Sequence, residues 1–137
     1  MANLTPVTIA EPWVRSILRI VAGFTFSLHG FQKLFGAFGG LGGHGGRVHL
    51  FSLLGLASCL ETFGGILLLI GLFTMPVAFI LCGEMAFAYF MQHFPRGPFP
   101  IQNGGELAVL YCFIFLYLFT AGPGPISADR LIRKKNR

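Results

Sequence analysis

The sequence predicts an all-α, polytopic membrane protein built as a bundle of four transmembrane helices. Of its 137 residues, 54% are hydrophobic and 11% are charged, whereas a soluble domain is normally about 25% charged. Apolar stretches cover 13–35, 50–72, 75–94 and 104–121, close to the roughly 20 residues that a helix needs to cross a bilayer. Glu61 and Glu84 lie near the middle of two stretches, which is typical of a polar centre buried away from lipid.

We expect one domain over residues 1–137, divided by local helix-breaking signals. Trp13 begins the first stretch as an interfacial anchor. The glycine-rich segment 36–49 is too flexible for a helix and forms an outer loop. Pro76 fits the first turn of the third helix, after a tight turn. The prolines within 94–100 and 122–125 end the third and fourth helices.

The charges predict how the chain is oriented. Much of the net charge of +5 comes from the basic C-terminal tail 126–137. A basic cluster beside an apolar run is typical of a topology signal or a contact with anionic lipid, rather than of nucleic-acid binding. Four spans place both termini on one side, with Arg15, Arg19 and the tail, and only three cations lie opposite, so both termini are predicted to be cytoplasmic. Ser127 can cap a short amphipathic helix there, with a frayed tail as the alternative.

One face of the first stretch is cationic. Helical residues advance by about 100° each, so Arg15, Arg19, His29 and Lys33 form a single stripe, which must face the bundle interior or a partner subunit rather than lipid. Counted from the turn at 73–74, the two central glutamates lie at the same depth.

The candidate polar cluster has two interpretations at this stage. Its members are Arg19, His29, Lys33, Glu61, Glu84 and Glu106. They can form a structural ion-pair network, with Arg19 on one glutamate and His29 or Lys33 on the other. Alternatively, His29 with Glu61 or Glu84 can bind a polar headgroup or move a proton.

Small residues and a capping pattern accompany this cluster. Gly64 and Gly65 let a neighbouring backbone approach closely. Asn103 followed by Glu106 has the spacing of a capping box at the start of the fourth helix, and the pair Gly104 and Gly105 also permits close approach. The alternative is that Glu106 turns inward and completes a cluster with Lys33 and His29.

No metal or haem site is predicted. The histidines of the outer loop, His44 and His49, have no accompanying cysteine or carboxylate. On a regular helix His93 lies about 180° from Glu84 and does not share its site. The cysteines form no C-x-x-C pair and are interpreted as small buried hydrophobes: Cys59, Cys82 and Cys112.

This set of residues resembles the DoxX-like family of small bacterial membrane proteins. The resemblance combines H-G-x-x-K in the first stretch with N-G-G-E at the start of the fourth, and covers most of the chain. The positions that carry it are Arg19, His29, Lys33, Glu61, Gly64, Gly65, Glu84, Asn103, Gly104, Gly105 and Glu106. It implies a four-helix bundle in the bacterial inner membrane, among relatives that include the membrane subunit of a thiosulfate–quinone oxidoreductase.

Three functions follow as hypotheses. The leading one is a membrane subunit of a redox system that meets the quinone pool, with a quinone as cofactor near His29, Glu61 and Glu84, and with other membrane or redox subunits, or further copies of this chain, as partners. The second is a non-catalytic accessory, anchor or assembly subunit of a larger membrane complex. The third is a small proton-coupled transporter.

Overall fold

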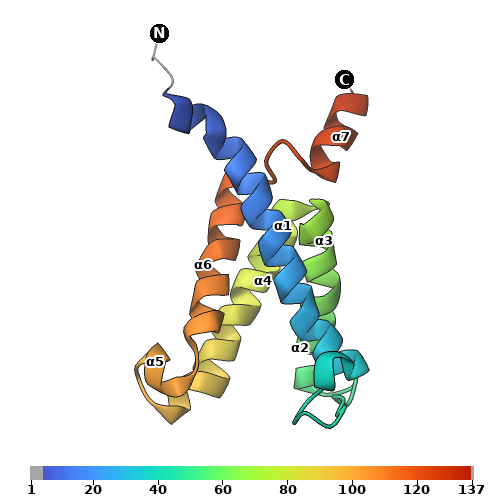
Figure 1. Ribbon diagram of the computed structural model, residues 1–137, viewed down its shortest axis with the longest axis vertical. Helices are drawn as coiled ribbons and strands as arrows, with labels where there is room; N and C mark the ends of the chain where they lie inside the picture. The colour runs from blue at the N-terminus through green and yellow to red at the C-terminus, as the bar shows by residue number, and fades with distance from the viewer. Residues whose placement is uncertain (1–4, 137) are drawn as a thin grey trace.

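The computed structural model describes residues 5–136, and the regular secondary structure of this part of the chain is helical, without a β-strand. Figure 1 shows the seven α-helices in chain order. They are α1 (Pro6–Phe35), α2 (Leu53–Cys59), α3 (Gly65–Ile70), α4 (Thr74–Ala88), α5 (Pro100–Asn103), α6 (Glu106–Ala121) and α7 (Ala128–Lys135).

Two π-helical turns extend these elements. Leu60–Gly64 joins α2 to α3, and Tyr89–His93 continues α4 into a short 3₁₀ turn at Phe94–Arg96. As a result Leu53–Ile70 and Thr74–Arg96 are each one continuous helical segment, and both are long and apolar enough to cross a membrane. α6 is equally apolar in character but has only 16 residues, about 24 Å at 1.5 Å per residue.

The first helix begins earlier than the sequence predicts. α1 starts at Pro6 rather than near residue 13, because the Thr5 hydroxyl accepts a hydrogen bond from the Thr8 amide at 3.3 Å and Pro6 suits the first turn. It ends at Gly36, whose φ of 69° is left-handed and suits a glycine. The glycine-rich loop then folds back on the helix, where the Val48 amide donates to the Lys33 carbonyl at 2.9 Å.

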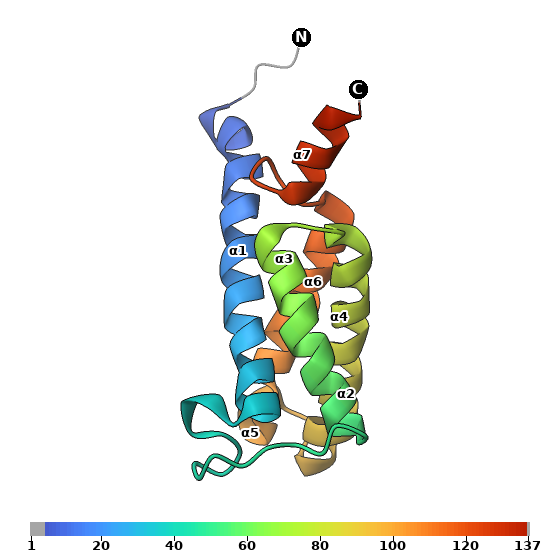
Figure 2. The same cartoon turned by 90° about the vertical axis from the view of Figure 1, so that its right-hand side faces the viewer.

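The long helices pack as two pairs, α1 against α2–α3 and α4 against α6 (Figures 1 and 2). Glycine makes the first pair close: a Cβ on Gly23 would lie 2.5 Å from the Leu69 nitrogen, and one on Gly65 would lie 2.7 Å from the Ser27 nitrogen. In the second pair the free thiols of Cys82 and Cys112 lie 3.7 Å apart.

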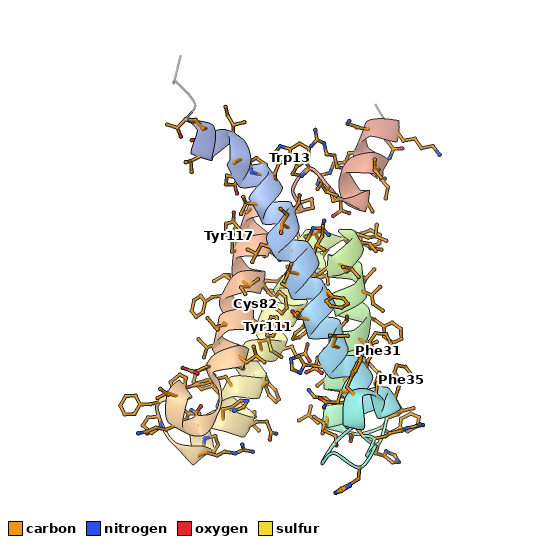
Figure 3. The ribbon with its side chains drawn as sticks, viewed as in Figure 1. Trp13, Phe31, Phe35, Cys82, Tyr111 and Tyr117 are labelled. Atoms are coloured by element: carbon orange, nitrogen blue, oxygen red, sulfur yellow. The ribbon has the colours of Figure 1, made fainter. Side chains whose placement is uncertain are left out.

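An aromatic cluster joins the two pairs. The Phe26 ring of α1 lies 4.9 Å, centroid to centroid, from each of the Tyr111 and Phe115 rings of α6. All three side chains are buried. Figure 3 shows Tyr111 near the middle of the molecule, where α1 crosses the α4–α6 pair. These contacts position the helices around the space described below.

The basic tail forms the short amphipathic helix that was predicted from Ser127 as its N-cap. The Ser127 hydroxyl accepts from the Arg130 amide at 3.3 Å and caps α7. α7 lies at the same end of the molecule as the start of α1 (Figures 1 and 2). The Asp129 carboxylate fixes it there by accepting from the backbone amides of Phe73 and Thr74 at 2.8 and 2.9 Å.

Candidate functional site

A cavity of about 690 Å³ lies between the two helix pairs, toward the end that carries α2 and α5. Most of its lining is apolar, with contributions from Phe26, Leu60, Met85 and Phe87 among others. A few polar side chains are placed within it: His29, Lys33, Glu61, Glu84, Gln92, His93 and Tyr111. A mostly apolar cavity with a small number of convergent polar groups is the usual form of a small-molecule site.

An ion pair links α1 to the π-helical turn in this cavity. Lys33 Nζ donates to Glu61 Oε1 at 2.6 Å, and Glu61 is only 4% exposed. Gly30 makes this possible, because a Cβ there would overlap the Thr62 side chain and backbone, so the two helices approach closely one turn from Lys33. The pair neutralises a carboxylate that would be costly to bury alone.

Three carboxylate oxygens in the same cavity have no hydrogen-bond partner in the part of the chain that the structure describes. They are Oε2 of Glu61 and both oxygens of Glu84, all buried. Buried polar atoms without partners are uncommon in folded proteins and are costly unless a proton, water or ligand satisfies them. The cavity is therefore suited to a molecule that brings hydrogen-bond donors or exchanges protons with these acids.

The first π-helical turn gives Glu61 its position. The Ser58 hydroxyl donates to the Leu54 carbonyl at 2.6 Å, and the Thr62 hydroxyl donates to the Ser58 carbonyl at 2.8 Å. Hydroxyls bonded back along the helix give extra partners to carbonyls where the backbone ladder changes register. π-helical turns occur frequently at functional sites, and this one carries the buried acid itself.

The second π-helical turn corrects the prediction that His93 lies away from Glu84. It inserts an extra residue into the turn, which rotates the following residues by about 100° and brings His93 to the cavity wall. His93 Nδ1 lies 3.1 Å from the Asn103 carbonyl. A carbonyl only accepts, so Nδ1 donates this hydrogen bond, and Nε2 is the other polar atom of the ring.

Tyr111 is a second site residue that the sequence argument did not single out. It lines the cavity, and its hydroxyl donates to Thr25 Oγ1 at 2.7 Å. Its ring meets that of His29 edge-on, with 6.3 Å between centroids. The available signal was a tyrosine in the middle of an apolar stretch, since a buried tyrosine hydroxyl needs a polar partner.

Arg19 does not join either glutamate, contrary to the predicted ion-pair network. It is fully buried, and its guanidinium donates to the backbone carbonyls of Leu68, Leu69, Pro123 and Ile126. The carbonyls at the C-terminal end of a helix have no partner within that helix, and α3 ends beside Arg19. The guanidinium closes the end of α3 and holds the segment that leads to α7.

Asn103 and Glu106 also differ from their predicted roles. Asn103 ends α5 instead of capping α6: its Oδ1 accepts from the Gly105 amide at 2.8 Å, and its Nδ2 donates to the Gly97 carbonyl at 2.8 Å. Glu106 begins α6, is exposed, and is not among the cavity residues. The capping box is absent because α5 and its glycine turn interrupt the helix before residue 106.

The small residues have separate positions. A Cβ on Gly64 would meet the Leu81 side chain at 2.8 Å, and Gly65 lies against the α1 backbone. Gly104 is left-handed with φ of 71° and lines the cavity, and a Cβ on Gly105 would lie 2.7 Å from the Tyr89 ring. Within residues 5–136, no three His, Cys, Asp or Glu side chains come together as metal ligands.

A comparison with protein families adds to this geometry. The family model described as DoxX matches residues 14–94, more than half of the chain. The chain belongs to the DoxX family. A protein of Haemophilus influenzae, described as uncharacterized, is 44% identical to it over 128 residues, which cover 91% of this chain and 95% of that protein. No solved structure matches. With its two apolar helices of spanning length, this DoxX protein is a small membrane protein.

Proposed function

We propose that this DoxX protein is an integral membrane subunit of a redox system and that its cavity binds the headgroup of a quinone or quinol. The observation that carries the proposal is the set of three buried, unpartnered carboxylate oxygens of Glu61 and Glu84 in a largely apolar cavity of about 690 Å³. A quinone meets the protein through two oxygen atoms on a flat ring and otherwise presents apolar surface, so few polar groups are required.

The polar residues fit both redox forms of such a ring. The hydroxyls of a quinol can donate to the free oxygens of Glu61 and Glu84. The carbonyls of a quinone need donors, which the Lys33 ammonium and a protonated carboxyl can supply. Residues at the edge of the cavity on α2 and α4, such as Leu56, Ile80 and Phe87, are about half exposed, so an apolar tail can leave the cavity toward lipid.

The chain's own residues hold and move the protons. A bound quinone would supply the two-electron chemistry, and a partner redox protein would exchange the electrons with it, because none of the cavity side chains is an electron carrier. Oxidation of a quinol would release two protons and two electrons, and Glu84, which has no ion-pair partner among residues 5–136, would accept one of the protons and return it when a quinone is reduced. Glu61, whose other oxygen contacts Lys33, would accept the second hydrogen bond and the second proton through Oε2.

The proposal includes a membrane arrangement. The segments α1, α2–α3, α4 and α6 each cross the bacterial inner membrane, with both termini in the cytoplasm. α1 is tolerated in lipid because its buried cation, Arg19, is satisfied by backbone carbonyls inside the protein. A redox partner, as a separate subunit, docks on this frame.

The test is quinone binding by the purified full chain. Protein extracted from its own membrane in mild detergent is analysed by lipid extraction and mass spectrometry, and a short-chain quinone is titrated in both redox forms. Glu61→Gln and Glu84→Gln are each expected to weaken quinol binding by about ten-fold or more, since each replaces an accepting carboxyl oxygen in the cavity with an amide nitrogen that only donates.

The matched control is Glu106→Gln, which removes an exposed carboxylate outside the cavity. We expect it to bind quinol as the unchanged protein does. Absence of quinone from the purified protein together with failure of the titration would contradict the proposal, as would equal losses in all three variants.

A second function is favoured by one observation, the Lys33–Glu61 pair. An acid already neutralised at 2.6 Å can serve to fix helix register without any reaction. In that case the protein is an accessory or assembly subunit. The same variants would then leave quinone binding unchanged but alter co-purification with the larger complex.

A further inference from the structure

A second cleft, of about 260 Å³, lies at the opposite end of the molecule between the start of α1 and α7. Its walls are Pro12 and Arg15 of α1, the segment around Pro123–Pro125, and Asp129, Arg130 and Arg133 at the start of α7. We propose that this cleft binds the phosphate of an anionic phospholipid. The proposal requires only that the chain is a membrane protein and is independent of the quinone site.

The cleft is preformed without a ligand, because hydrogen bonds attach α7 to the rest of the protein. The Asp129 carboxylate accepts from the Phe73 and Thr74 amides at 2.8 and 2.9 Å, and the Asp129 amide donates to the Gly71 carbonyl at 2.9 Å. Arg19 holds the preceding Ile126 carbonyl from inside the bundle. Arg130 and Arg133 are therefore held opposite Arg15 without a ligand.

The charges in the cleft favour an anion. Three arginines face one acid, Asp129, and both of its oxygens are already occupied by backbone amides. Neither Arg130 nor Arg133 forms an ion pair with any residue of the part that the structure describes. Guanidinium groups match the oxygens of a phosphate in paired hydrogen bonds.

Arg15 contributes an unused donor. Its terminal nitrogens reach the Ala121 carbonyl and, at 3.7 Å, the Glu11 carboxylate, while its Nε is buried and has no acceptor within residues 5–136. A buried donor without a partner is costly. An oxygen of a phosphate in the cleft can satisfy it.

The surroundings identify the source of the phosphate as a lipid. The apolar helices end at this level: α3 at Ile70 and α6 at Ala121. Trp13, the single tryptophan of the chain, is 54% exposed at this end (Figure 3), and tryptophan is enriched where a membrane protein meets the headgroups. On α7, Leu131 is 70% exposed beside the basic residues, as in helices that lie in the interface.

The experiment compares two double variants that remove the same charge from the same helix. Arg130→Gln with Arg133→Gln changes the cleft, whereas Lys134→Gln with Lys135→Gln changes the next turn, outside the cleft. Binding of dioctanoyl-phosphatidylglycerol and dioctanoyl-phosphatidylcholine to the detergent-solubilised full chain is measured by native mass spectrometry, and circular dichroism checks that the helices are retained.

We expect the unchanged protein to prefer phosphatidylglycerol. The cleft variant should lose affinity for it by about thirty-fold, from roughly 1 kcal/mol for each cation near a lipid phosphate, and the Lys134 and Lys135 variant should lose less than about three-fold. Equal losses in the two variants would mean diffuse attraction to the tail and would overturn the site, as would no loss in either.

Two further measurements test whether the site is preformed and whether its ligand is a lipid or a soluble phosphate. Asp129→Asn weakens the attachment of α7 but keeps all three arginines, so a built site predicts reduced selectivity for phosphatidylglycerol, whereas unchanged selectivity would overturn it. Glycerol 3-phosphate offers the same chemistry without a tail. We expect it not to compete, and displacement of the lipid by it would show that the cleft takes a soluble phosphate instead.

Discussion

Two cations of α1, the buried Arg19 and the partly buried Lys33, are satisfied in different ways. Arg19 donates its hydrogen bonds to the backbone carbonyls of four other residues. Lys33 contacts one oxygen of Glu61, while the second oxygen of that acid and both oxygens of Glu84 have no partner among residues 5–136. The donors of Arg19 are satisfied within the protein and stabilise the fold. The acceptors around Lys33 are only partly satisfied, so this region is suited to bind a ligand and exchange protons.

The largest effect is expected from substitution of Arg19. Arg19→Met leaves several buried carbonyls without donors, so we expect a loss of at least about 3 kcal/mol of unfolding free energy and poor recovery of folded protein. Thermal unfolding in detergent measures it. Arg19→Lys keeps the charge but not the planar donor set and should fall between. A variant as stable as the unchanged protein would contradict a structural role for Arg19.

The glycines offer a second contrast. Gly65→Ala places a Cβ 2.7 Å from the Ser27 nitrogen and 2.9 Å from the Gly23 carbonyl, so α1 and α3 must separate, at a cost of about 1–3 kcal/mol. Gly83→Ala is the matched control on the cavity side, where a Cβ meets nothing within 4 Å and higher helix propensity predicts a neutral or slightly stabilising effect. Melting temperatures of the two variants should diverge, and equal values would show that the close approach is unimportant.

A moderate energetic coupling is expected between Lys33 and Glu61. Lys33→Met and Glu61→Gln, made singly and together, form a double-mutant cycle, in which we expect an interaction energy of about 1–2 kcal/mol. The single variants should each be destabilised because each leaves a buried or partly buried charge without its partner. An interaction energy near zero would mean that the 2.6 Å contact does not persist in the folded protein.

The smallest effect is expected at Glu106. It is exposed and lies outside the cavity, so Glu106→Gln should change the unfolding free energy by less than about 0.5 kcal/mol. The same melting experiment measures this. A large loss of unfolding free energy would show that Glu106 is coupled to the cavity residues and is not an independent surface residue.

The sequence by itself determined the local features of this protein. Apolar stretches, glycine and proline breaks and a serine cap predicted helices close to their observed limits, and helical periodicity placed Arg19, His29 and Lys33 on one inward face. These features follow from residues within a few turns of one another. The DoxX resemblance was likewise carried by short local motifs, and the family match confirmed it.

The tertiary structure decided which polar residues meet. Lys33 rather than Arg19 pairs with Glu61 because Gly30 brings α1 against Thr62, while Arg19 lies beside the end of α3. His93 enters the cavity because a π-helical turn rotates it, and Arg15 faces Arg130 because Asp129 fixes α7 to a turn more than fifty residues away. Such pairings depend on backbone approach and register between distant segments, which no local pattern encodes.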